Sequence, residues 1–143
     1  MKLITSDHAA TNKSLADLFG RVREVRLLVC GGRDYHDQDT VFAVLDGIVS
    51  LTDPTKVSIC HGAAPGADQL AGEWAKSRGI PCQEFPAHWY SYGRWAGPKR
   101  NLEMLNKFRP TLVVAFPGGA ETRDMVTKAT HAGIALLDIK GKK

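Results

Sequence analysis

Apolar runs of strand length alternate with amphipathic segments of helix length along most of this chain, and this alternation limits the fold more than any other feature. The apolar runs are nearly continuous, which is typical of strands whose two faces are both covered by helices. Regular alternation of strands and helices indicates a parallel sheet with right-handed crossovers. The predicted strands span residues 25–30, 57–60, 81–85, 111–116 and 134–139.

The segments between these strands have the periodicity of helices. In the first of them Val41, Val44, Leu45 and Ile48 fall on one stripe, as expected for a helix that packs against a sheet. The predicted helices span residues 40–49, 68–77, 98–108 and 122–131. We therefore predict an α/β, Rossmann-like, doubly wound parallel sheet of about five strands with helices on both faces.

The pattern of residues before the first predicted strand indicates a separate helix. Ser14 and Asp17 have the spacing of a capping box, and Leu15, Leu18 and Phe19 follow helical spacing. We predict an N-terminal helical extension over residues 1–24, packed outside one nucleotide-binding domain over residues 25–143. A chain of 143 residues is long enough for one such domain to bury its core without disulfides or metal.

Composition excludes several classes of protein. With 43% hydrophobic and 24% charged residues, the chain resembles average globular domains rather than disordered ones. It has no apolar run of membrane-spanning length and no signal-peptide pattern, so we predict a cytoplasmic protein without a membrane partner. Cys30, Cys60 and Cys82 form no metal-ligand spacing, so we predict neither a metal site nor a cofactor. A net charge of +4 suits an anionic ligand but does not require one.

Three loops that follow predicted strands carry glycines and polar residues, and they give the candidate ligand site. In a doubly wound sheet the ligand binds beyond the carboxyl ends of the strands. Glycines before a helix let a ligand approach backbone N–H groups, which favours phosphates, although tight turns alone also explain them. The candidate ligand-binding residues in these loops are Gly31, Gly32, Arg33, Asp34, His61, Gly62, Gly66, Asp68, Pro117, Gly118, Gly119, Glu121 and Thr122.

A long aromatic segment over residues 86–97 leads from the third predicted strand to a helix that opens with two cations. Trp95 is a candidate for stacking on a base, and a dimer contact or a satellite core is the alternative. Lys99, Arg100 and Asn101 are candidates for binding an anionic group, with solvated charge as the alternative for the two cations. For Asp68 we favour capping of a helix N-terminus over a role in ligand binding or catalysis. His61 could bind the ligand, but a lone histidine at a strand end more often has a structural role.

Four ordered motifs closely resemble the YspA/cpYpsA-related branch of the SLOG superfamily. They are Cys30-Gly-Gly-Arg-Asp-Tyr35, the segment over residues 61–75, Gly97-Pro-Lys-Arg-Asn101 and the segment over residues 116–125. The resemblance implies a Rossmann-like nucleotide pocket formed by the glycine loops and an expectation of a homodimer. The superfamily also includes the Lonely Guy phosphoribohydrolases and the DNA-processing protein Smf/DprA.

The resemblance to the Lonely Guy enzymes also implies catalytic residues. Arg100 and Asp124 match the arginine and the acid that carry hydrolysis of a nucleotide N-glycosidic bond in those enzymes. Asp124 stands where the Lonely Guy pattern has a glutamate, and Glu121 replaces a glycine of the PGGxGT motif. Glu121 therefore brings bulk and negative charge near the expected phosphate.

Three functions follow from these observations. The leading hypothesis is a protein that binds a nucleotide-derived small molecule as a sensor or sequestering module. The second is an active nucleoside-monophosphate phosphoribohydrolase, and whether the chain is an enzyme stays open. Binding of single-stranded nucleic acid is the least favoured, because the basic residues are scattered and the excess of positive charge is small.

Overall fold

The computed structural model describes residues 3–5 and 8–141, and its centre is a six-stranded sheet whose strand pairs are all parallel. The order across the sheet is β1-β6-β5-β2-β3-β4. The strands are β1 (Leu3–Thr5), β2 (Val25–Cys30), β3 (Val57–His61), β4 (Cys82–Glu84), β5 (Leu112–Ala115) and β6 (Ala135–Asp138). The predicted α/β fold with a parallel sheet is confirmed.

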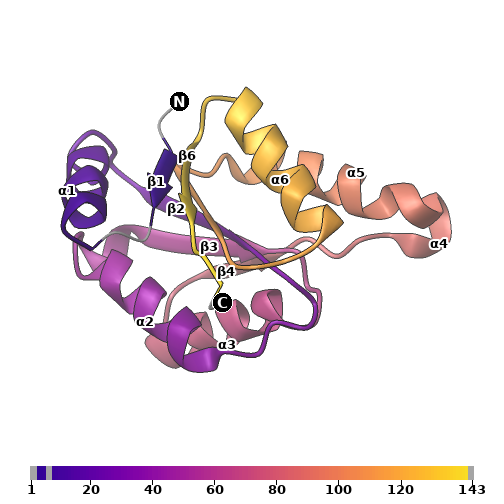
Figure 1. Cartoon of the computed structure of the whole chain (residues 1–143), viewed down its shortest axis with the longest axis horizontal. Helices are drawn as coiled ribbons and strands as arrows, with labels where there is room; N and C mark the ends of the chain where they lie inside the picture. Colours follow the sequence, from indigo (N-terminus) through magenta and orange to yellow (C-terminus); the bar gives the residue numbers. More distant parts are fainter. Residues whose placement is uncertain (1–2, 6–7, 142–143) are drawn as a thin grey trace.

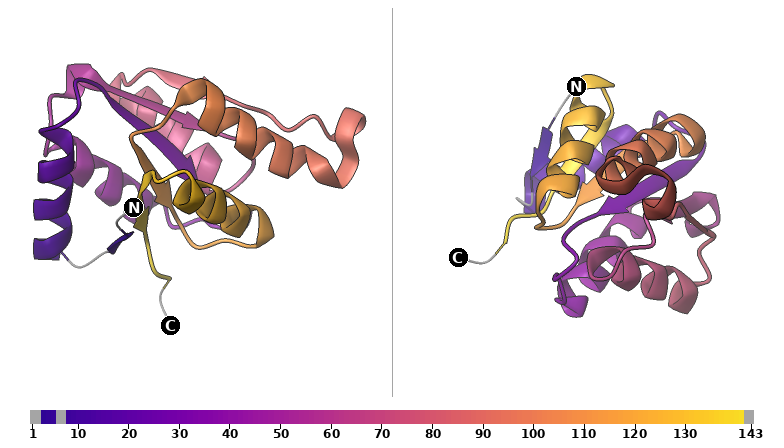
Figure 2. Two further views of the ribbon diagram at one scale, coloured as in Figure 1. Left: turned by 90° about the horizontal axis from the view of Figure 1, so that it is seen from above. Right: turned by 90° about the vertical axis from the view of Figure 1, so that its right-hand side faces the viewer.

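Helices cover both faces of the sheet. In Figure 1, α1, α2 and α3 lie on one side of the strands, and α5 and α6 lie on the other. The left view in Figure 2 shows α4 at one end of the molecule, beyond the end of α5. The α-helices are α1 (His8–Phe19), α2 (Gln38–Val49), α3 (Ala67–Arg78), α4 (Trp89–Tyr92), α5 (Ala96–Glu103) and α6 (Ala120–His131). Shorter turns are η1 (Pro54–Lys56), η2 (Gly93–Trp95) and the π-helical η3 (Met104–Phe108).

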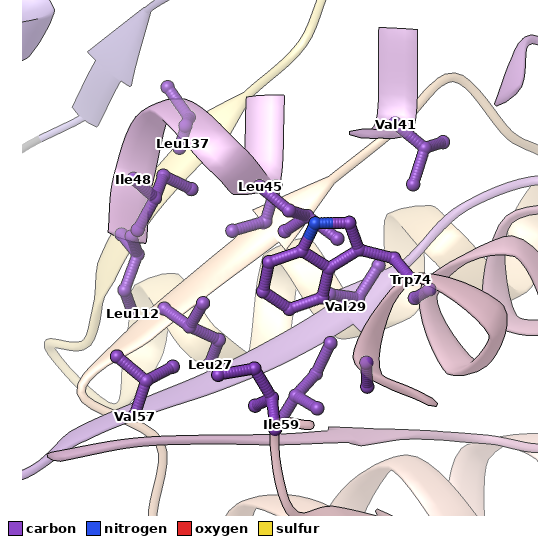
Figure 3. Close-up of a cluster of buried hydrophobic side chains, with 14 of the residues drawn as sticks. Leu27, Val29, Val41, Leu45, Ile48, Val57, Ile59, Trp74, Leu112 and Leu137 are labelled. Carbon is purple, nitrogen blue, oxygen red and sulfur yellow. The ribbon is translucent and has the colours of Figure 1, made fainter. Parts of the chain in front are cut away.

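The side chains of β2 alternate between two hydrophobic cores. Leu27 and Val29 point to the core shared with α1, α2 and α3, whereas Leu28 and Cys30 belong to the core under α5, η3 and α6. Figure 3 shows the first core, in which the indole of Trp74 lies over the strands. This period of two, with apolar residues on both faces, explains why the strand reads as a continuous apolar run.

The N-terminal segment differs from the prediction in two respects. Leu3–Thr5 adds a strand to the sheet by pairing with β6, so this segment is not only helical. The helix begins at His8, which places Ser14 inside α1, and the predicted capping box at Ser14 is therefore wrong. Residues 1, 2, 6, 7, 142 and 143, which the predicted domain ranges include, lie outside the described residues.

The segment over residues 86–97, expected as a loop, contains the short helices α4 and η2. In the part of the chain that the structure describes, no helix combines the length and apolar character needed to cross a membrane.

Candidate functional site

The strand order reverses direction between β2 and β5, and the loops after these two strands meet at that point. The chain runs from β2 to β3 and β4 on one side, and from β5 to β6 on the other. The N–H of Gly32 donates to the carbonyl of Pro117 at 2.8 Å. A Cβ atom on Gly118 would lie 2.7 Å from the nitrogen of Gly32, so only glycine permits this approach. Doubly wound sheets bind ligands at this kind of switch point.

The loop after β3 joins the same cluster through Gly66. This glycine has a φ of 80°, and a Cβ atom on it would overlap the carbonyl oxygen of Gly32. That carbonyl accepts the N–H of Ala67 at 3.1 Å, the first residue of α3. The three glycine loops predicted from the sequence therefore touch one another at one edge of the sheet.

A narrow crevice of about 20 Å³ lies between these loops and α5. Its walls are formed by residues from β2, α3, α5, η3 and α6 and by the loops between them. The lining residues are Val29, Cys30, Gly31, Arg33, Ala64, Asp68, Arg100, Asn101, Met104, Glu121 and Thr122. The structure thus brings Gly31, Arg33, Asp68, Arg100, Asn101, Glu121 and Thr122 together, as the sequence predicted for a common site.

A second, wider hollow of about 500 Å³ adjoins the crevice, and Arg33 lines both. It is lined by Gly32, Arg33, Asp34, Tyr35, Pro117, Gly118 and Gly119. The ring centroid of Tyr35 lies 5.6 Å from that of Phe116 at its base. Burial, assisted by the charge of Asp37, raises the pKa of the Tyr35 hydroxyl.

Arg100 is buried in the crevice and is held by three acceptors. Its Nη1 donates to the carbonyl of Gly62 at 2.6 Å, and its Nε donates to Oδ1 of Asn101 at 3.1 Å. Its Nη2 forms an ion pair with Oε2 of Glu121 at 3.1 Å. A Cβ atom on Gly62 would overlap the guanidinium, so glycine at this position leaves the space that Arg100 fills.

Asp124 lies in α6 beside this crevice, and two donors hold the same oxygen of its carboxylate. Nδ2 of Asn101 contacts Oδ2 at 3.0 Å, and Nζ of Lys128 contacts it at 2.6 Å. Lys128 also donates to the carbonyl of Pro98 at 3.2 Å. Asn101 contacts both Arg100 and Asp124, so these two residues belong to one hydrogen-bond network. They are the two catalytic candidates that the family resemblance implied.

Asp68 is buried at the start of α3, where its Oδ2 accepts the N–H groups of Gly62 and Ala64 at 3.1 Å and 3.2 Å. Loss of hydration on burial raises the pKa of this carboxyl to about 6, against the opposing effect of both N–H groups and of Arg100. Asp68 therefore ties down the loop after β3. The predicted capping of a helix by Asp68 is wrong, because α3 begins with Gly66 as its N-cap and no side chain caps it.

Cys30 also faces the crevice. Burial, assisted by the charge of Asp68, strongly raises the pKa of its thiol. Because the thiolate is the reactive form, this environment disfavours a nucleophilic role, and Cys30 packs in the hydrophobic core.

Three candidate residues lie away from the crevice. His61 is buried on the opposite side of its loop, where Nδ1 accepts the N–H of Ala63 at 2.9 Å. Trp95 is 61% exposed, with the guanidinium of Arg94 5.4 Å from its ring centroid. Lys99 is exposed, and its Nζ lies 4.5 Å from the ring centroid of Tyr92.

The sequence reasoning missed several residues of the site. Tyr35, Ala64 and Met104 line the two hollows but were not among the candidate site residues. Lys128 was missed as well, although its spacing of four residues from Asp124 in a helix is a known signal for an ion pair. Over residues 3–5 and 8–141 no group of three or more His, Cys, Asp or Glu side chains is arranged to hold a metal ion.

Comparison with known proteins is consistent with the motifs. The model of the "YspA, cpYpsA-related SLOG family" matches residues 25–92. The Gene 61 protein of Mycobacterium phage D29 is 31% identical over 124 residues, which cover 82% of this chain and 98% of that protein. Among solved structures, the C-terminal domain of a hydrogenase from Pyrococcus furiosus matches with a TM-score of 0.49 and 13% identity, over 80% of this chain and 90% of that one.

Proposed function

Because the chain belongs to the YspA, cpYpsA-related SLOG family, we propose that it binds a nucleotide-derived small molecule in the crevice and the adjoining hollow. Membership of this family confirms the resemblance seen in the motifs and supports a nucleotide-related role in general. The observation that carries the proposal is the meeting of the loops after β2 and β5, where Arg33 lines two adjoining hollows at the switch point of the sheet.

The two hollows differ in chemistry, which suits a ligand with two different parts. The crevice contains the buried side chains of Arg100, Asn101 and Asp68, whereas the wider hollow presents backbone from glycines and the ring of Tyr35. Glycine backbone can approach a phosphate closely, and an aromatic ring can pack against a base. A nucleotide derivative supplies both kinds of group.

The arrangement around Asp124 supports a second function, hydrolysis of an N-glycosidic bond. Asn101 and Lys128 both donate hydrogen bonds to Oδ2 of Asp124. The other carboxylate oxygen, Oδ1, would then accept a hydrogen bond from a ribose hydroxyl or a water molecule. Cleavage would add water across the bond between ribose and base and release both as separate products. We place this activity second because Arg100, its expected partner, is engaged by Glu121.

A ligand panel tests both functions. The protein is incubated with AMP, ADP-ribose, NAD and cyclic nucleotides while its melting temperature is measured and the products are separated by chromatography. A ligand that raises the melting temperature and stays intact supports binding alone, since a ligand that binds only the folded state stabilises it. A consumed ligand with free base released supports hydrolysis, and Asp124→Asn should then abolish release while retaining the fold.

Two arginine variants test whether the ligand that raises the melting temperature binds in the proposed site. Arg33→Ala removes an exposed cation that lines both hollows, and Arg23→Ala removes an exposed cation that precedes β2, at the opposite end of the strand. Arg33→Ala should reduce the ligand-induced shift, and Arg23→Ala should leave it unchanged. Equal shifts in wild type and Arg33→Ala, or no shift with any ligand of the panel, would argue against the proposed site.

A further inference from the structure

Every nitrogen of the Arg100 guanidinium already donates to an acceptor of the protein. The acceptors are Oδ1 of Asn101, the carbonyl of Gly62 and the carboxylate of Glu121. The Arg100 side chain is only 7% exposed, so these groups enclose it. These contacts use three of its five N–H groups, and a phosphate that approached the remaining N–H groups on Nη1 and Nη2 would meet the carboxylate of Glu121 at Nη2.

Glu121 supplies the negative charge next to Arg100 that an anionic ligand would otherwise supply. Its Oε2 lies 3.1 Å from Nη2 of Arg100, and its side chain is 36% exposed. The carboxyl group also packs on the backbone of α5, since a Cβ atom on Gly97 would lie 2.9 Å from its Cδ and Oε1 atoms. The carboxylate of Glu121 is therefore seated between α5 and α6, on the wall of the crevice.

We propose that Glu121 determines the ligand specificity of the crevice by occupying the anion position on Arg100, so that the ligand places an uncharged ribosyl group there and not a terminal phosphate. This inference rests on the proposed function, and it narrows the ligand class. Ribose hydroxyls donate hydrogen bonds, and carboxylates are acceptors only, so Glu121 and Asp124 offer a ribosyl group complementary partners.

Electrostatic repulsion gives the physical reason for excluding a phosphomonoester. A phosphate that bound Arg100 would have to displace the carboxylate of Glu121. The displaced carboxylate would stay nearby, because Glu121 is fixed in the first turn of α6 and its carboxyl group already packs against Gly97 of α5. Like charges at such short distances repel strongly, so we expect phosphate to bind at least about tenfold more weakly than it would without this charge.

The test compares wild type with Glu121→Gln, which keeps the size of the side chain and removes its charge. Inorganic phosphate is titrated into each protein in a calorimeter, and the amide signals of Gly31 and Thr122, which line the crevice, are followed by NMR to locate binding. Glu121→Gln should bind phosphate at least about tenfold more tightly than wild type, with shifts at these amides. Glu73→Gln in α3, outside the crevice, makes the same charge change and should leave phosphate binding at the wild-type level.

Adenosine and AMP are then titrated into the same proteins, which separates this inference from the proposed function. Relative to wild type, Glu121→Gln should gain affinity for AMP and none for adenosine. Equal phosphate affinity in wild type and Glu121→Gln overturns the inference even if both proteins bind nucleotides. A gain in phosphate affinity without binding of adenosine or AMP to any variant supports the role of Glu121 at Arg100 and refutes the proposed nucleotide ligand.

Discussion

The buried carboxylate of Asp68 makes the stability of this protein depend on pH in a defined window. Its pKa is raised from 3.8 to about 6 in the folded protein, chiefly because burial removes its hydration. Well below its ordinary pKa of 3.8, the group is protonated in both the folded and the unfolded state. Between about pH 4 and 6 the unfolded chain loses this proton while the folded protein keeps it, so the free energy of unfolding falls as the pH rises.

The size of this effect follows from the shift. A difference of about two pKa units corresponds to about 3 kcal/mol, since each unit is about 1.4 kcal/mol. Asp68→Asn keeps the shape and an oxygen that can accept the N–H groups of Gly62 and Ala64, but it carries no charge at any pH. The variant should match wild type near pH 4 and exceed it by up to about 3 kcal/mol at pH 7.

Urea denaturation at several pH values between about 4 and 7.5 measures this difference, because subtracting the two proteins cancels the titration of all other groups. Asp17→Asn, an exposed residue of α1, is the matched control and should show a nearly constant difference from wild type. A difference between Asp68→Asn and wild type that stays flat across this range would refute the assignment of a raised pKa to Asp68. Lower stability of the variant at pH 7 than at pH 4, relative to wild type, would refute it as well.

Two glycine substitutions should change stability in opposite directions, each measured by the midpoint of urea denaturation. A Cβ atom on Gly31 would lie 2.5 Å from Cβ of Ala67 and 2.9 Å from Cβ of Phe116, so Gly31→Ala should cost roughly 1–3 kcal/mol through overpacking; an unchanged midpoint would contradict this packing. Gly47 is exposed inside α2, and a methyl group on it would meet no neighbouring side chain within 4 Å. Gly47→Ala should therefore add roughly 0.5–1 kcal/mol from helix propensity, and a loss of stability would show that α2 is not a regular helix there.

The periodicity of the sequence was sufficient to predict most of the sheet. The run at residues 25–30 became β2 with the predicted bounds, because a strand buried on both faces has few polar positions. The strand at Leu3–Thr5 was missed, since three residues are too few to show a period of two. Its place beside β6 depends on pairing with residues more than 130 positions away.

Strand alternation explains why His61 is absent from the lining of the crevice. The predicted strand ended at residue 60, which left His61 in the loop as a ligand candidate. In the structure β3 includes His61, and because Cys60 faces the core under α5, His61 faces α3 on the opposite side. One residue at a strand end therefore decided the direction of this side chain.

The sequence by itself determined the order of strands and helices, the loops that carry the site and the family to which the chain belongs. These properties are local, since they depend on periodicity, on glycine positions and on short motifs. Only the tertiary structure decided that Glu121 neutralises Arg100, and that Asn101 joins Arg100 to Asp124. Residues 100 and 121 lie on different helices, and the distance between them depends on how α5 and α6 pack on the sheet. A local sequence pattern does not contain this information.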